Sequence, residues 1–511
     1  MSSKIKKILF FVVFFSLTLF TRFYKLDWGN GYFFHPDENN MASSVLKMKQ
    51  SDLNPHFFAY GQFPLFLTFF TTPQHNFPSI IITLRFWSAF FSTLSVFFCY
   101  LIGLKIFKSS KISSLFTLII ILTPGLIQTA HFGTTESILF FVFVVNIYLS
   151  IKISEKFNFK NILLASLISG IGLATKISSV ILITPILLSL LFYLVKNKKI
   201  FRFMFSIFIF LLLTIIFGVI FSPYNLIRFE EFKSSIAYEV GVANGNVLVF
   251  YTRQFIKTVP YLFQVQKIFP YTNGLPILLF SFFGLYFVIK SYFLKNKLNI
   301  KLLLILIPSL IFFLYQGQLF VKWTRFMSPI FFVPPLLAIY FFEKIKNFFL
   351  KSILVIISIL PGVLFLKIYL FEDIRVQASG WIDKNIPDNS IILSESGNVL
   401  NLPLSNKNFD TTNFNFYELD NFNQKQNELN KLIQKADYIL IPSRRVFKNQ
   451  NNNNFPESQN YYQNLFSGNS NFSLIKIFSI NNSFLLDPEN AEETWSVFDN
   501  PTIRIFKRNE I

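Results

Sequence analysis

The sequence predicts an α-helical membrane protein that crosses the bilayer many times and ends in a small water-soluble domain. Of its 511 residues, 52% are hydrophobic and only 14% are charged, which is unlike the composition of a soluble chain. The hydrophobic residues gather in long runs up to residue 371, whereas the remainder of the chain is polar. This composition excludes a disordered protein, a collagen and a soluble coiled coil.

Eleven apolar runs approach the roughly 17 to 25 residues that a helix needs to cross the hydrocarbon core. The first run follows Lys4, Lys6 and Lys7 and resembles a signal peptide, but it lacks a small-residue cleavage site, so we interpret it as a retained helix. The run at 57–72 is too short to span and is interrupted by Pro64. The expected spans are 5–24, 84–104, 112–130, 137–151, 161–175, 177–195, 203–222, 274–289, 302–318, 326–342 and 352–371.

The charges are distributed unevenly between the two sides of these spans. With the N-terminus in the cytoplasm, the cytoplasmic segments carry a net charge of +18, whereas the outer segments before residue 372 carry +5. This distribution follows the positive-inside rule and predicts a multi-pass protein of the cytoplasmic (plasma) membrane. The overall charge of +20 is therefore mainly a topology signal, and a nucleic-acid partner is disfavoured.

Two outer segments are longer than a connection requires, and long loops in compact proteins are usually functional. They are the outer loops 25–83 and 222–273. The first loop contains a helix-like stretch at 37–50, with Pro36 or Asp37 placed to start it. We expect these loops to carry functional residues at the outer face.

The chain divides into a transmembrane domain at 1–371 and a soluble extracytoplasmic domain at 372–511, here called the tail. Alternation of apolar and polar residues predicts a small α/β domain in the tail. The single cysteine, Cys99, excludes an intramolecular disulfide framework and a cysteine-based zinc site. The expected strands are 391–394, 438–442 and 502–507.

Polar residues gather at the outer ends of the predicted helices, although charged groups near membrane depth are costly unless they are paired or hydrated. Lys176 stands in a tight turn between two spans, which leaves its side chain little room to reach bulk water. Four such groups fall on the same side: His35-Pro-Asp37-Glu38, His131-Phe-Gly-Thr134-Thr-Glu136, Lys176, and Lys322-Trp-Thr-Arg325.

Three of these groups also have a plain structural explanation. Asp37 and Glu38 stand at a helix start, where the helix dipole and free amides favour carboxylates, and Glu136 precedes the fourth span in a similar way. Arg325 could simply anchor a helix at the interface. The four polar groups nevertheless all fall on one outer surface, and a single site explains this better than four independent structural roles do. Acids that face cations at a membrane boundary suit a substrate with a phosphate and a reacting hydroxyl.

Several short motifs occur in order along nearly the whole chain. On them the chain resembles the membrane glycosyltransferases of the GT-C superfamily, in the group that contains protein O-mannosyltransferases and lipid A aminoarabinose transferases. Glu136 stands where related enzymes often have aspartate. The motifs are HPDE at 35–38, YGQFPL at 60–65, RFWSA at 85–89, AHFGTTE at 130–136, GLATK at 172–176, RFMSP at 325–329, WIDKNIP at 381–387 and FDNPTIRIF at 498–506.

The resemblance implies a GT-C fold and an inverting transfer of a sugar from a polyprenyl-phosphate carrier to an acceptor hydroxyl at the outer face of the membrane. Lys176 and Arg325 would bind the donor phosphate. Asp37 would be the base that takes the hydroxyl proton, and Glu38 could do so instead. The remaining expected residues are Glu136 at the catalytic centre and His35, His131, Arg85 and Tyr60 in supporting positions.

The candidate ligands for a divalent metal cofactor are Glu38, His131 and Glu136. Their spacing is not a recognised metal-binding pattern, so the sequence leaves metal dependence open.

The expected partners are the lipid-linked sugar donor, a lipid, glycan or protein acceptor, and membrane lipid. The alternative function is a transporter or flippase for a lipid-linked substrate, which would use the same helices. Secondary transporters, however, usually place ionisable groups near the midplane rather than at one edge.

Overall fold

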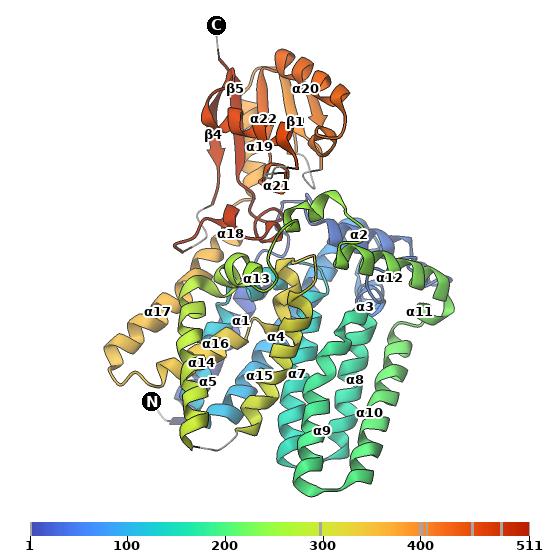
Figure 1. Cartoon of the computed structure of the whole chain (residues 1–511), viewed down its shortest axis with the longest axis vertical. Coiled ribbons are helices and arrows are strands. Elements are labelled where there is room, and N and C mark those ends of the chain that lie inside the picture. The colour runs from blue at the N-terminus through green and yellow to red at the C-terminus, as the bar shows by residue number, and fades with distance from the viewer. Residues whose placement is uncertain are drawn as a thin grey trace.

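The tail lies at one end of a bundle of long helices and contacts the bundle there (Figure 1). The computed structural model describes residues 3–295, 299–397, 402–404, 407–450, 454–480 and 484–509. We call the end of the bundle that faces the tail the tail end.

Each predicted span coincides with one helix or with two consecutive helices, because each apolar run is long enough to bury its backbone hydrogen bonds in a helix. The single helices are α1 (Ser3–Phe23), α4 (Phe77–Phe107), α7 (Glu136–Glu155), α8 (Phe159–Thr175), α10 (Ile200–Phe221) and α15 (Ile300–Gly317). The consecutive pairs are α5 (Ser110–Ile121) with α6 (Pro124–His131), η1 (Ile177–Ile183) with α9 (Thr184–Asn197), η3 (Pro270–Gly274) with α14 (Leu275–Lys295), η4 (Thr324–Ile330) with α16 (Val333–Phe342), and α17 (Phe348–Phe365) with α18 (Lys367–Leu370).

The predicted count of eleven crossings is not confirmed. In the described part of the chain, seven helices are long and apolar enough to cross a membrane, or up to nine if each bent pair is one span. The bent pairs are α5 with α6, at 55°, and η4 with α16, at 52°. The described part of α1 from Phe11 onward and the whole of α8 are shorter apolar helices. Both bends have prolines at the start of the second helix, where the missing N–H ends the preceding helix.

The outer loops form short helices at the tail end. The helix predicted at 37–50 is α2 (Pro36–Lys47), which starts at the expected proline. The apolar run at 57–72 contains α3 (Phe63–Thr71), a helix of only 9 residues. The second loop forms α11 (Tyr224–Ile227), α12 (Phe229–Asn244), η2 (Phe250–Phe255) and α13 (Leu262–Lys267).

The tail contains one five-stranded mixed sheet with the order β2-β1-β3-β5-β4. Strands β2, β1 and β3 are parallel, and β5 pairs antiparallel with β3 and β4. The three predicted strands are present, whereas β2 and β4, which form the two edges, were missed. The strands are β1 (Ile391–Glu395), β2 (Asp410–Phe414), β3 (Tyr438–Ile441), β4 (Phe472–Phe478) and β5 (Ile503–Arg508), and the helices are α19 (Ile374–Asn385), η5 (Phe416–Glu418), α20 (Asn423–Lys435), α21 (Arg445–Asn449), α22 (Pro456–Ser467), η6 (Pro488–Asn490) and η7 (Glu493–Trp495).

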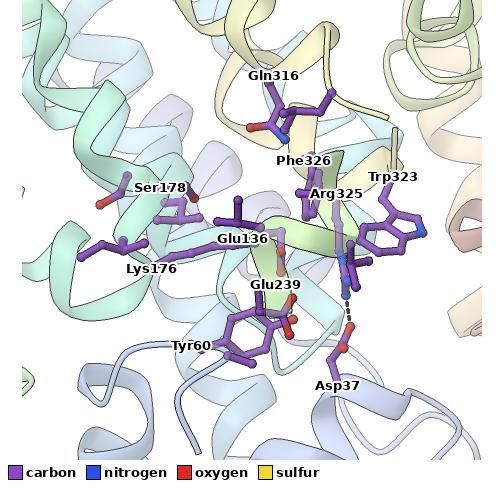
Figure 2. Close-up of a pocket in the computed structure, with 18 of the residues that line it drawn as sticks. Asp37, Tyr60, Glu136, Lys176, Ser178, Glu239, Gln316, Trp323, Arg325 and Phe326 are labelled. Carbon is purple, nitrogen blue, oxygen red and sulfur yellow. Dashed lines mark ion pairs between the residues drawn. The ribbon is translucent and has the colours of Figure 1, made fainter. Parts of the chain in front are cut away.

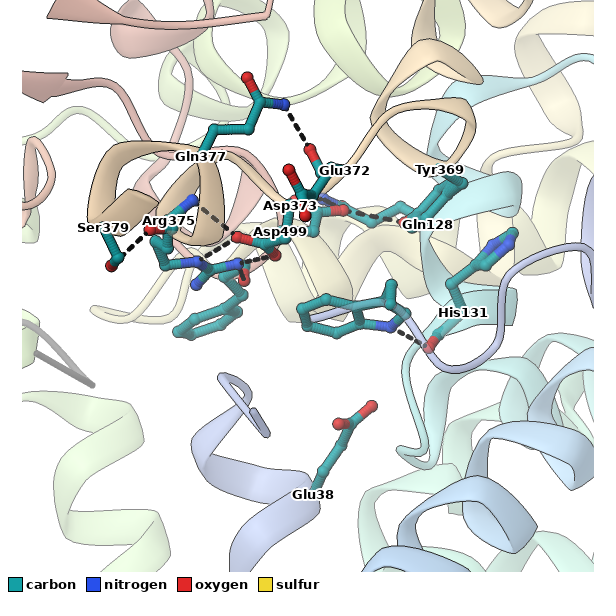
Figure 3. Close-up of polar contacts among 12 residues, drawn as sticks. Glu38, Gln128, His131, Tyr369, Glu372, Asp373, Arg375, Gln377, Ser379 and Asp499 are labelled. Atoms are coloured by element: carbon teal, nitrogen blue, oxygen red, sulfur yellow. Dashed lines mark hydrogen bonds and ion pairs between the residues drawn. The ribbon is translucent and has the colours of Figure 1, made fainter. Parts of the chain in front are cut away.

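One segment of the tail, residues 491–500, packs against the helix bundle instead of the sheet. Trp495 and Phe498 share an apolar cluster with Trp28, Phe34 and Tyr369. Its polar part is the Asp499 carboxylate, which accepts hydrogen bonds from the Tyr369 hydroxyl at 2.9 Å and the Gln128 amide at 3.2 Å (Figure 3). Burial raises the pKa of Asp499 to about 7. The tail is therefore joined to the bundle by a buried contact and not by a linker alone.

Candidate active site

A cavity of about 840 Å³ lies between the tail end of the bundle, the outer loops and the tail. Asp37, Glu136, Lys176 and Arg325, which come from four distant parts of the sequence, all line it (Figure 2). Its wall is mixed, with aromatic rings such as Trp323 and Phe326 between the charged groups. Cavities of this size and character are typical small-molecule sites.

Asp37 and Arg325 form an ion pair across this cavity. Asp37 stands in the first turn of α2 and Arg325 in the first turn of η4, and their side chains are 20% and 17% exposed. The guanidinium of Arg325 also lies 5.1 Å from the ring centroid of Trp323, a cation–π contact. The contact with Trp323 therefore fixes the guanidinium, and both members of the ion pair line the cavity.

His35 lies next to Asp37 but is not hydrogen-bonded to it through Nδ1. Its Nδ1 lies 3.9 Å from Oδ2 of Asp37, and its ring packs between Phe132 and Phe498 at centroid distances of 4.6 and 4.4 Å. Burial, followed by the charges of Arg325 and Arg85, lowers the pKa of His35 well below its usual value, so the imidazole is neutral at pH 7. A neutral, closely packed histidine fits a supporting position better than proton transfer.

Lys176 occupies the opposite part of the cavity. Its ammonium lies 4.4 Å from the ring centroid of Phe326 and 5.4 Å from that of Tyr60. The carboxylates of Glu136 and Glu239 lie close enough to act on its charge. Glu136 is 2% exposed, and its Oε2 has no hydrogen-bond partner in the described structure. A buried carboxylate oxygen without a partner thus lies in the wall of the cavity, and such a group calls for an explanation.

Gly61 explains how Tyr60 reaches Lys176. The Gly61 N–H donates a hydrogen bond to the Thr175 carbonyl oxygen at 2.9 Å, directly before Lys176 in the chain. A Cβ on Gly61 would lie 2.1 Å from the Ala174 carbonyl oxygen, so this approach of the outer loop to α8 requires glycine.

Glu38 does not line the cavity. Its carboxylate is fully buried and forms an ion pair with Arg85 at 2.7 Å, and it accepts a hydrogen bond from the Gly133 N–H at 2.6 Å. Arg85 also donates to the carbonyl oxygens of Leu26 and Trp28. Glu38 and Arg85 thus form a buried ion pair that links the first outer loop to α4, whereas Asp37 lies at the cavity.

The expected metal ligands are not brought together. Both ring nitrogens of His131 face backbone carbonyl oxygens, of Ile127 at 2.8 Å and Tyr24 at 2.9 Å, and its ring stacks on Tyr369. Glu38 is bound to Arg85, which leaves Glu136 alone at the cavity. Among the described residues, no group of three or more His, Cys, Asp or Glu side chains is placed to hold a metal ion. These residues do not fit a metal centre.

The cavity wall also contains charged residues that the sequence motifs did not indicate. Glu239 comes from α12, and burial raises its pKa, an effect that the charge of Lys176 opposes. Arg445 and Glu493 come from the tail and form a buried pair, with Nε and Oε1 3.3 Å apart. The length of the outer loop 222–273 was a signal for Glu239, whereas no sequence signal placed the two tail residues here.

Glu492, the neighbour of Glu493, fastens this part of the tail to the site. Its Oε2 accepts a hydrogen bond from the Thr324 N–H at 2.9 Å, next to Arg325, and its Oε1 accepts one from the Gln254 amide at 2.9 Å. The tail thereby fixes the start of η4, the helix that carries Arg325. The tail therefore forms part of the site.

A comparison with curated protein sequences found no match to this chain. A comparison with family models found one match, over part of the chain. Residues 12–233, less than half of the chain, match the model of the family described as dolichyl-phosphate-mannose-protein mannosyltransferase. This region carries Asp37, Glu136 and Lys176 but not Arg325.

Three solved structures are similar to this chain. The apo oligosaccharyltransferase of Archaeoglobus fulgidus matches with a TM-score of 0.53 and 12% identity, over 89% of this chain and 72% of that chain. ArnT from Cupriavidus metallidurans, bound to undecaprenyl phosphate, matches with a TM-score of 0.49 and 10% identity, over 99% and 98% of the two chains. The Saccharomyces cerevisiae Pmt1–Pmt2 protein O-mannosyltransferase complex, bound to its sugar donor, matches with a TM-score of 0.37 and 18% identity, over 45% and 35%. The predicted GT-C fold is confirmed by the match to the oligosaccharyltransferase, and at these identities the likeness concerns the fold.

Proposed function

We propose that this chain is an inverting glycosyltransferase that moves a sugar from a polyprenyl-phosphate carrier to an acceptor hydroxyl. The observation that carries the proposal is the single cavity lined by Asp37, Glu136, Lys176 and Arg325. The match of residues 12–233 to a family named for a sugar on dolichyl phosphate, which is a polyprenyl phosphate, supports this donor class. The acceptor is a lipid, a glycan or a protein.

The chemistry needs one base and a place for negative charge. The acceptor oxygen attacks the anomeric carbon, the bond from that carbon to the phosphate oxygen breaks, and the hydroxyl proton passes to Asp37. The leaving polyprenyl phosphate takes the electron pair of the broken bond. Lys176 and Arg325 bind that phosphate, and the charge that grows on it is stabilised by their cations. Glu136 positions the sugar through its free carboxylate oxygen.

The ion pair between Asp37 and Arg325 has a consequence for the order of binding. In the structure, the carboxylate that serves as the base is held by the cation that serves the phosphate. A donor phosphate competes for Arg325 and so releases Asp37. We infer that the donor binds before the base becomes active, which limits proton transfer in the absence of donor.

The phosphate-binding role predicts the effect of removing one cation. Lys176→Ala should weaken donor binding by about tenfold or more and lower turnover, because a charge-assisted contact to phosphate is lost. Purified protein in detergent, supplied with a synthetic polyprenyl-phosphate sugar, allows donor binding and sugar release to be measured separately. The matched control is Lys233→Ala, which removes the same group from an exposed position on α12.

The same assay tests the proposed function as a whole. Release of sugar to an acceptor, or slow release to water, is the expected result for the unchanged protein. A protein that moves the donor across a vesicle membrane without cleaving it would instead be a flippase, and the transfer proposal would be wrong.

We further propose that the tail and the cavity lie outside the cytoplasmic membrane, as the net charge of +18 on the opposite segments supports. A cysteine placed at Lys431, exposed on α20, should react with an impermeant maleimide on intact cells. The native Cys99 is buried and gives little background. The control is a cysteine at the exposed Lys160 at the other end of the bundle, which should react only after lysis. The opposite labelling pattern would reverse the orientation.

A further inference from the structure

A second cavity, of about 330 Å³, lies beside the candidate active site. Three separate segments form it: residues 254–267 of the second outer loop, residues 444–448 around α21, and residues 489–491 of the tail. It lies where the second outer loop and the tail meet. The cavity contains none of the residues assigned above to sugar transfer.

The charges of this second cavity are mainly positive. Lys267, Arg444 and Lys448 line it, and Glu489 is the one acid among its lining residues. The Glu489 carboxylate is already held by both terminal nitrogens of the Arg504 guanidinium. Three cationic side chains thus line the second cavity, and the charge of Glu489 is already neutralised by Arg504.

Arg444 is only partly satisfied in this position. It is 7% exposed, it donates through Nη1 to the Ala491 carbonyl oxygen, and its buried Nε has no hydrogen-bond partner in the described structure. Burial lowers the pKa of Lys267, and the charges of Arg444 and Lys448, which line the same cavity, lower it further. The charges of Glu492 and Glu493 act on Arg444 as well.

Glu492 and Glu493 already have partners of their own and do not line the second cavity. Glu492 accepts hydrogen bonds from the Thr324 N–H and the Gln254 amide, and Glu493 is paired with Arg445. They therefore offset part of the positive charge without filling the hollow. A guanidinium and two ammonium groups around an empty space match the oxygens of a tetrahedral anion.

We propose that this second cavity binds a phosphate-bearing group, at a site separate from the one for the donor phosphate. Its chemistry suits a phosphate monoester or diester, whether this belongs to a lipid headgroup or to a soluble molecule.

The position of the second site connects it to the first. Arg444 and Arg445 are adjacent in the chain, yet Arg444 lines the second cavity and Arg445 the first. The wall between the cavities is Gln254 with residues 491–493, and the Gln254 amide contacts both Glu492 and Glu493. A phosphate held by Arg444 would therefore contact the wall that positions Arg445 and Thr324.

Equilibrium dialysis of radiolabelled inorganic phosphate against purified protein tests this proposal. We expect two independent sites. The pair Lys267→Gln with Lys448→Gln should weaken one site by at least about tenfold and leave the other unchanged. Lys176→Gln should weaken only the other. Both lysines of the second cavity are half-buried, so these variants should fold, and thermal unfolding of each variant checks this.

The control for charge is the pair Lys431→Gln with Lys435→Gln, two exposed lysines of α20. An equal loss of phosphate binding in this control, or unchanged binding in the cavity variant, would overturn the proposal. Arg444→Lys keeps the charge but removes the fork of the guanidinium, and it should also weaken this site several-fold. Because the readout is binding, these outcomes do not depend on sugar transfer.

The source of the phosphate is distinguished by competition in nanodiscs. Phosphatidic acid in a phosphatidylcholine bilayer should displace labelled phosphate from this site if the ligand is a lipid headgroup. Glycerol phosphate in solution, with phosphatidylcholine alone, should displace it if the ligand is soluble. Displacement by either one, lost in the Lys267 and Lys448 variant, supports the proposal, whereas displacement by neither contradicts it.

Discussion

Asp37→Asn is expected to lower turnover by about 10²- to 10⁴-fold while donor binding is kept. Asparagine has nearly the same size as aspartate but cannot accept the acceptor's proton. The change also removes the ion pair with Arg325, so the guanidinium no longer has to leave a carboxylate before it binds phosphate. The donor should therefore bind at least as tightly as in the unchanged protein.

Donor binding and single-turnover transfer, measured on the same purified variant, check this expectation. The matched control is Asp27→Asn in the same outer loop, where the Asp27 side chain is 66% exposed and does not line the cavity. Near-normal turnover in folded Asp37→Asn would exclude Asp37 as the base. A parallel loss of donor binding would show instead that the carboxylate mainly organises Arg325.

The adjacent acids Asp37 and Glu38 show where sequence reasoning stops. The sequence predicted a helix start at this point, and the structure confirms it. Consecutive residues on a helix, however, point about 100° apart, so only one of two neighbours can face a given cavity. Which one does so depends on where Arg85 lies, on a helix 47 residues further along the chain. The sequence alone left both acids as candidates for the base.

The tail shows a similar limit. Its buried strands could be predicted, because apolar residues concentrate there. Strand β2 has the sequence DTTNF and lacks an apolar run. Strand β4 has the apolar sequence FSLIKIF but was not predicted, and five of its seven residues are exposed at the edge of the sheet. The contribution of Arg445 and Glu493 to the cavity depends on how the tail docks. That docking depends on Trp495, Phe498 and Asp499, whose partners lie more than a hundred residues away.

The membrane spans were predicted from length and hydrophobicity, which locate helices but not bends. The bends occur between α5 and α6 and between η4 and α16, at the tail end where η4 carries Arg325. A bent helix leaves backbone groups near membrane depth that must be satisfied by neighbouring protein. At the other end of η4, Glu492 accepts a hydrogen bond from the N–H of its first residue, Thr324, so a residue of the tail stabilises the start of this bent pair.

Glu38→Gln is expected to destabilise the fold, by about 3 to 5 kcal/mol, rather than to act on turnover alone. The side chains of Glu38 and Arg85 are both 0% exposed, so a neutral partner leaves the Arg85 guanidinium buried without its counterion. The Gly133 N–H also loses its bond to a charged oxygen. Gly133 lies three residues before Glu136 and fits tightly against Leu84, so loosening it should disturb the cavity indirectly.

Thermal or denaturant unfolding in a fixed detergent measures this effect, with Glu231→Gln as the control. The Glu231 carboxylate lies 3.0 Å from Nδ1 of His56, both side chains are largely exposed, and exposed contacts of this kind contribute less than about 1 kcal/mol. In the cycle with Arg85→Gln, the double variant should be less destabilised than the sum of the single variants, because the unpaired buried charge is gone. Should Glu38→Gln keep normal stability and donor binding while turnover is lost, Glu38 would be the base and Asp37 a partner of Arg325.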